Sequence, residues 1–68
     1  MDTITLKIPS ISCGHCVMTI KREGGAVEGV EFVSGDPEAK TATFQVTNEQ
    51  ALKQLKATLA EAGYPAEN

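Results

Sequence analysis

The stretch from residue 2 to residue 16 is DTITLKIPSISCGHC, a strand pattern followed by a segment that holds both cysteines of the chain. Apolar and polar residues alternate over residues 2–8, which is typical of a half-buried strand. Pro9 ends the pattern, and residues 10–14 are mostly small or polar, as in a loop. The inward-facing residues of this strand are expected to be Ile4, Leu6 and Ile8.

A short helix is expected next, from about residue 16 to residue 23. Val17 and Ile20 are three residues apart, so both can face a core. Ser12 is a candidate N-cap. The glycine pair that follows residue 23 is expected to end the helix.

A second and longer helix is expected after residues 47–50, which are TNEQ. Either Asn48 is its N-cap, or Thr47 and Gln50 form a capping box. Gly63 stands just after the last turn, where glycine commonly ends a helix. Apolar residues recur between these ends at helical spacing, namely Ala51, Leu52, Leu55, Leu59 and Ala62.

Two further strands are expected at residues 27–34 and 39–46, joined by a turn at residues 35–38. The second strand alternates regularly, with its apolar side formed by Ala42, Phe44 and Val46. The first is less regular, because three of its residues compete for the inner face: Val30, Phe32 and Val33. Its register is therefore open at this point.

Residues 64–68 can form a short edge strand, with Pro65 limiting its pairing. The expected order is then β-α-β-β-α-β. This order predicts an α+β, ferredoxin-like fold, in which a four-stranded antiparallel sheet carries both helices on one face. A chain of 68 residues is long enough for a single domain, which is expected to span residues 1–68.

Composition excludes several classes of function. The net charge is −3 with six Lys and Arg, so the chain has no basic stripe for nucleic acid. Apolar runs reach two or three residues, which is far too short to cross a bilayer. The N-terminus lacks a signal-peptide pattern, and we expect a soluble cytoplasmic protein. No general base is evident, so no enzymatic activity is expected.

Cys13 and Cys16 form a C-x-x-C motif at the expected start of the first helix. Amide groups and partial positive charge at a helix N-terminus lower a thiol pKa from ~8.5 toward ~3.5–7.5. Two thiolates held close together can bind one soft ion from both sides. With so few ligands the pattern favours Cu(I), whereas a structural Zn(II) site needs four.

Other interpretations of the motif stay open. A thiol–disulfide redox pair is one, although such proteins are usually longer α/β chains. Two inert core cysteines are another, although a loop with Gly14 and His15 is poorly suited to a core. Ile11 is expected to insert into the core and anchor the loop, leaving both sulfurs exposed.

Three further side chains have two interpretations each. His15 is expected to point to solvent, with metal ligation or thiol tuning as the alternative. Met18 is expected on the surface or filling a gap, although a thioether can bind Cu(I). Tyr64 either covers the end of the sheet or shields the metal with its ring.

The chain resembles the heavy-metal-associated domain family over essentially all of its 68 residues. The resemblance includes the order of elements, the C-x-x-C after the first strand, Gly29-Val30 at the second strand and Ala62-Gly63-Tyr64 after the second helix. Cys13 and Cys16 match the metal-binding cysteines of the family. Tyr64 matches a tyrosine common in bacterial copper chaperones, and Ile11 stands where the family usually has methionine.

This resemblance implies a metallochaperone that binds one Cu(I) and passes it to a similar dithiol, such as that of a copper-transporting P-type ATPase. Zinc-selective members tend to have an acidic residue before the first cysteine, where this chain has Ser12. Mercury-binding relatives share the motif, so Hg(II) is an alternative to Cu(I), as is Zn(II). The resemblance is compatible with an apo monomer and with a metal-bridged dimer.

Overall fold

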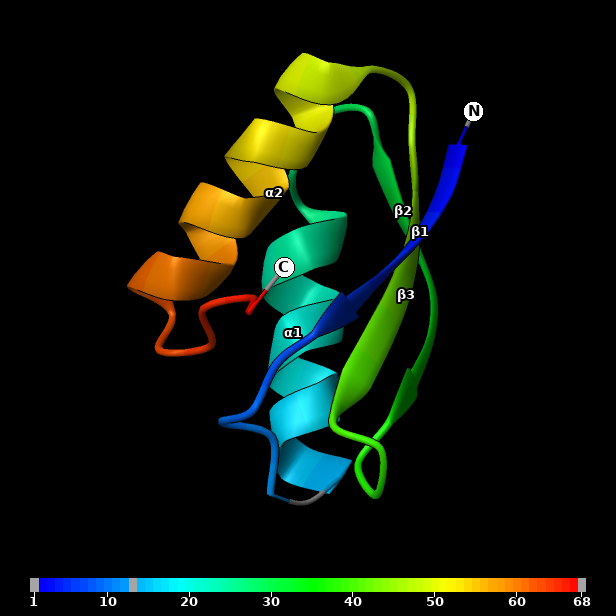
Figure 1. The fold of residues 1–68 in the computed structure, drawn as a ribbon. Helices are drawn as coiled ribbons and strands as arrows, with labels where there is room; N and C mark the ends of the chain where they lie inside the picture. Colours follow the sequence, from blue (N-terminus) through cyan, green and yellow to red (C-terminus); the bar gives the residue numbers. More distant parts are fainter. Residues whose placement is uncertain (1, 13, 68) are drawn as a thin grey trace.

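The computed structural model describes residues 2–12 and 14–67. Both helices lie against one face of an antiparallel sheet (Figure 1). In the described residues the sheet has three strands, in the order β1-β3-β2. The elements are β1 (Asp2–Lys7), α1 (Gly14–Gly25), β2 (Val30–Asp36), β3 (Thr41–Val46) and α2 (Glu49–Glu61).

The central strand β3 alternates as its sequence predicts. Its buried residues are Ala42, Phe44 and Val46. Phe44 is directly opposite Ile4 of β1 and Phe32 of β2. The Phe32 and Phe44 rings meet edge to face with centroids 5.5 Å apart. Phe44 is therefore the centre of the sheet's inner face, against which both helices pack.

A β-bulge in β2 determines which of its apolar residues face the core. Val30 pairs with Val46, and the pairing then shifts between Phe32 and Ser34. Val33 is the extra residue of this bulge, and it is 50% exposed. An added residue reverses the alternation of a strand, which explains why the sequence pattern was irregular here.

The turn between β2 and β3 lies at residues 37–40, two residues later than predicted. Asp36 ends β2, and its Oδ1 accepts hydrogen bonds from the backbone N–H groups of Glu38 and Ala39. Such side-chain bonds stabilise a turn locally. Lys40 then adopts a φ of 59°, which reverses the chain into β3.

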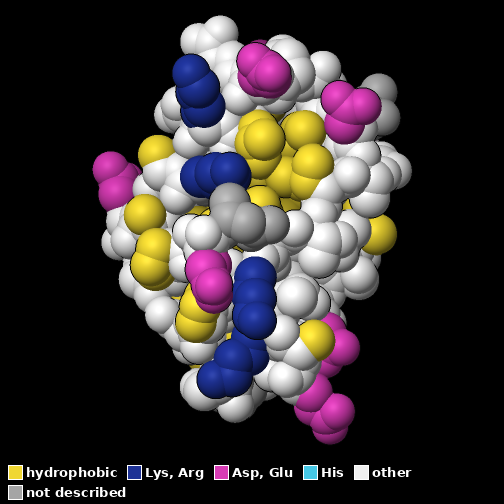
Figure 2. All heavy atoms as spheres, in the orientation of Figure 1, with side chains coloured by type: hydrophobic (Ala, Val, Ile, Leu, Met, Phe, Trp, Pro, Cys, Tyr) yellow, Lys and Arg dark blue, Asp and Glu magenta, His cyan; other side chains and the backbone are white. Residues whose placement is uncertain are grey.

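The predicted fourth strand is not formed by residues 64–67, so the expectation of a four-stranded sheet is wrong for the described chain. Pro65 has no N–H to donate to a ladder. This segment nevertheless reaches the end of β1, where the Glu67 N–H donates to the Lys7 carbonyl at 2.7 Å. Apolar side chains are visible at the surface between α2 and β1 (Figure 2).

Helix α1 continues through both glycines that were expected to end it. Its buried residues are Cys16, Ile20 and Gly24, at a spacing of four. A Cβ on Gly24 would lie 2.7 Å from Phe44 Cε2 and 3.0 Å from Leu55 Cδ1. Gly24 therefore permits close packing of α1 against β3 and α2, which is a different role from helix termination.

Helix α2 begins and ends as predicted. Asn48 is the N-cap, and its side chain accepts a hydrogen bond from the Ala51 N–H at 2.8 Å, so the Thr47 capping box is not used. At the other end Gly63 has a φ of +95°, and the Tyr64 N–H donates to the Leu59 carbonyl at 2.8 Å. This is the Schellman arrangement. None of the described helices is long and apolar enough to span a membrane.

Candidate metal centre

The loop between β1 and α1 is anchored by two buried isoleucines. Ile8 and Ile11 are both 0% exposed. The Ile11 N–H donates to the Ile8 carbonyl at 3.0 Å, and the Ile8 N–H donates to the Lys40 carbonyl at 2.7 Å. The predicted insertion of Ile11 into the core is confirmed. This packing anchors residues 8–11 to the core.

Cys16 lies in the first turn of α1 and belongs to the hydrophobic core, with 9% of its surface exposed. The prediction that its sulfur would be exposed outside the core is wrong. The physical reason is the start of α1 at Gly14, which places Cys16 on the same buried side as Ile20. Cys13, the other predicted ligand, lies outside the described residues.

Ser12 is the residue in this region whose role the sequence did not reveal. Its Oγ lies 3.6 Å from Cys16 Sγ, in hydrogen-bonding contact. Ser12 was a candidate N-cap, but α1 begins at Gly14, two residues later. The spacing of four residues between Ser12 and Cys16 was the available signal for this contact. A hydroxyl here can donate to a thiolate and stabilise its charge.

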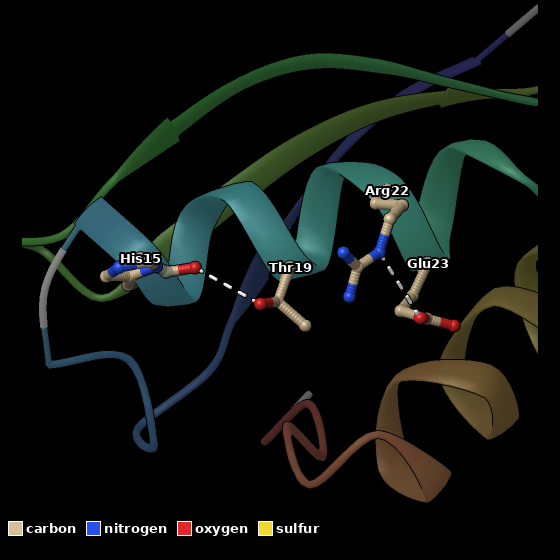
Figure 3. A network of polar contacts seen from close by, with 4 residues as sticks. All are labelled: His15, Thr19, Arg22 and Glu23. Carbon is tan, nitrogen blue, oxygen red and sulfur yellow. Dashed lines mark hydrogen bonds and ion pairs between the residues drawn. The ribbon is translucent and has the colours of Figure 1, made fainter.

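Gly14 and His15 form the exposed start of α1. A Cβ on Gly14 would meet nothing within 4 Å, so the glycine leaves open space beside the cysteine motif. The His15 side chain is exposed, as predicted, and its carbonyl accepts a hydrogen bond from Thr19 Oγ1 at 3.2 Å (Figure 3). The described residues contain no group of three or more His, Cys, Asp and Glu that could hold a metal ion.

Tyr64 is half-buried and packs against the core just after α2. Its partial burial agrees with the interpretation of Tyr64 as a half-buried aromatic residue, and coverage of the end of the sheet stays a prediction. A contact between Tyr64 and a bound metal stays a prediction. Met18 is 68% exposed on α1, in agreement with its predicted surface position.

The arrangement at Cys16 suits the binding of a soft ion. Its thiol lies at the N-terminal turn of a 12-residue helix, where backbone amides and the helix dipole favour negative charge. Ile8 and Ile11 anchor the loop that leads toward this helix. A second thiolate supplied by Cys13 would complete a two-sulfur ligand set of the kind that soft metals prefer.

Comparison with known proteins shows which family the chain resembles along most of its length. The sequence model of the heavy-metal-associated domain matches residues 5–65. The chain is 41% identical over 67 residues to the mercuric transport protein periplasmic component of Shigella flexneri, covering 96% of this chain and 72% of that protein. It is 33% identical over 60 residues to a COP-associated protein of Helicobacter pylori, covering 88% of this chain and 91% of that protein.

Solved structures show the same fold. Oxidized MerP from Ralstonia metallidurans CH34 superposes with a TM-score of 0.84 at 31% identity, over 97% of this chain and 93% of that chain. Apo-CopP from Helicobacter pylori superposes with a TM-score of 0.75 at 29% identity, over 96% of this chain and 98% of that chain. The relatives thus include a mercuric transport protein and a COP-associated protein.

Proposed function

The chain belongs to the heavy-metal-associated domain family, and from this premise we propose that it is a single-domain metal carrier. Cys13 and Cys16 bind one Cu(I) ion, which the protein passes to a partner that also offers two thiols. A copper-transporting P-type ATPase with such a metal-binding domain is the partner that the family resemblance indicates. The carrier acts in the cytoplasm and performs no enzymatic reaction.

The observation that supports this proposal most strongly is the placement of Cys16. Its side chain lies on the buried side of the first turn of α1, in contact with the Ser12 hydroxyl at 3.6 Å. The loop before it is held by Ile11, which is fully buried. This packing supports the proposal, because a thiol that is already held by the core loses little freedom when it binds a metal.

Transfer of Cu(I) to the partner is possible because an ion held by only two sulfurs can accept a third. A partner thiol loses its proton to solvent, and the resulting thiolate adds to the two-coordinate Cu(I). The resulting three-sulfur intermediate loses one of the carrier's sulfurs, which takes up a proton. A second exchange of the same kind completes the transfer with no change in the oxidation state of copper or sulfur.

Hg(II) is the second candidate cargo. The specific observation that favours it is the 41% identity to a mercuric transport protein over 96% of this chain. Thiolates are soft ligands that suit both ions, so the ligand pair is the same for either cargo.

The test is an anaerobic titration of the reduced protein with Cu(I) in the presence of a competing chelator, with parallel titrations of Hg(II) and Zn(II). We expect one tightly bound Cu(I) per chain and loss of this binding in the Cys13→Ser variant. Met18→Leu removes an exposed sulfur outside the motif. It is the matched control, because its affinity for the first equivalent of Cu(I) should be unchanged. Full affinity in Cys13→Ser would refute the proposed site.

Two further readouts separate the alternatives. Competitive binding of Hg(II) without competitive binding of Cu(I) would assign the protein to mercury. Efficient reduction of a disulfide substrate by the metal-free protein would indicate a thiol–disulfide redox function instead. Size exclusion of the loaded sample tests whether the metal bridges two chains.

A further inference from the structure

A second pair of soft-metal donors lies on the outer side of α1. His15 and Met18 are both exposed, and Met18 exposes 68% of its surface. Neither side chain belongs to the hydrophobic core. Cys16 lies between them in the sequence but faces the core, so the exposed pair lies on a different side of α1 from Cys16.

The helix brings the two side chains together. Residues three apart in an α-helix have Cβ atoms about 5–6 Å apart on one face. His15 and Met18 also line the same shallow surface hollow, together with Thr19 and Arg22. Both side chains are flexible enough at this separation to converge on one ion, since Met has three rotatable bonds.

The neighbouring polar groups leave the pair accessible. Thr19 Oγ1 donates to the His15 backbone carbonyl at 3.2 Å, and this bond does not involve the imidazole (Figure 3). Arg22 Nε lies 3.7 Å from Glu23 Oε1, which offsets part of the positive charge one turn further along (Figure 3).

The chemistry of the two donor groups determines which ions they can bind. An imidazole nitrogen and a thioether sulfur are both neutral, and the thioether is a soft ligand. Hard divalent cations require several oxygen ligands, which this pair does not provide. We infer that His15 and Met18 together bind a second soft monovalent ion, Cu(I) or its redox-stable analogue Ag(I). Binding is weaker than at two thiolates, because neither donor carries negative charge.

The chain is well suited to a direct test, because it has one histidine and two methionines. We would label the methionine methyl groups with ¹³C and titrate the reduced protein with silver nitrate in chloride-free buffer. The first equivalent should fill the cysteines and give a thiolate-to-metal absorption band. The second should shift the Met18 methyl and His15 ring signals along one common binding curve, with the Met1 methyl as the internal reference.

Two conservative surface variants show whether the donors act together. In Met18→Leu, the His15 ring should respond with at least a roughly tenfold weaker apparent affinity, which corresponds to about 1.4 kcal/mol. In His15→Gln, the Met18 methyl response should weaken by a similar factor. Thr19→Ala is the matched control, since it alters the same hollow without removing a metal donor and should leave both responses unchanged.

Three results would overturn the inference. One is a Met18 methyl signal that does not shift at the second equivalent of silver. Another is a His15 ring response with the same midpoint in Met18→Leu as in the unsubstituted protein, which would mean that histidine binds alone. The third is an equal shift of Met1 and Met18. The cysteine proposal is judged separately by the absorption band, because loss of that band with a retained His15 and Met18 response refutes the cysteine site alone.

Discussion

Two adjacent glycines at the end of α1 allow its packing against the sheet to be tested with a matched pair of substitutions. Gly24→Ala and Gly25→Ala add the same methyl group to neighbouring helical positions. A Cβ on Gly24 would lie 2.7 Å from Phe44 Cε2 and 3.0 Å from Leu55 Cδ1. A Cβ on Gly25 would meet nothing within 4 Å.

The expected change in the free energy of unfolding is the sum of two opposing effects, helix propensity and overpacking. Replacing glycine by alanine in a helix gains up to about 1 kcal/mol of helix propensity, and Gly25→Ala should gain part of this amount. At Gly24 the gain is outweighed by overpacking, which typically costs about 1–3 kcal/mol. Phe44 and Leu55 are both 0% exposed, so their side chains have little room to move away. We expect Gly24→Ala to be less stable than Gly25→Ala by about 1–3 kcal/mol.

Urea unfolding followed by circular dichroism measures this difference. The midpoints should separate while the slopes remain similar, because the surface exposed on unfolding is nearly the same in both variants. For a domain of this size, each 1 kcal/mol corresponds to a difference in melting temperature of about 4–8 °C. If Gly24→Ala is as stable as Gly25→Ala, the close approach of α1 to Phe44 is refuted.

Four further substitutions test the fold and the site by the same unfolding measurement. Leu59→Ala should lower the free energy of unfolding by about 2–5 kcal/mol, because Leu59 is fully buried, and an unchanged melting temperature would contradict the assigned face of α2. Asn48→Ala should lower the free energy of unfolding by about 1 kcal/mol, because the hydrogen bond from the Ala51 N–H is lost. Thr47→Ala should lower it by less, since Thr47 is not the N-cap. Cys16→Ser should cost about 1–3 kcal/mol by placing a hydroxyl in the core; a fully stable variant would argue against the burial of Cys16.

The proposed binding of metal by Cys16 can be tested independently of these effects on stability. Cys16→Ala removes the same proposed metal ligand as Cys16→Ser but places no polar group in the core. Both variants should lose tight Cu(I) binding, although they should differ in stability. This comparison separates ligation by Cys16 from its contribution to packing.

Local sequence signals predicted the elements well where the determining contacts are local. The alternation in β1 and β3 matches their buried residues, because neighbouring side chains in a strand point to opposite faces. The start and end of α2 were also predictable, since Asn48 and Gly63 act through hydrogen bonds within a few residues. The position of Cys16 at the start of a helix follows from the same kind of signal.

The errors arose where a contact joins distant parts of the chain. The bulge at Val33 depends on how β2 pairs with β3. The continuation of α1 through Gly24 depends on Phe44 and Leu55, which are far away in the sequence. Residues 64–67 do not form the expected strand, because pairing with β1 depends on donors that Pro65 lacks.

For the candidate site, the sequence alone determined the identity and spacing of the two thiols, and with them the prediction of a soft metal. The tertiary structure alone decided that Cys16 faces the core beside Ser12, while His15 and Met18 face solvent. The physical reason is that ligand chemistry belongs to individual side chains. Burial instead depends on where a helix begins and which of its sides packs against the sheet.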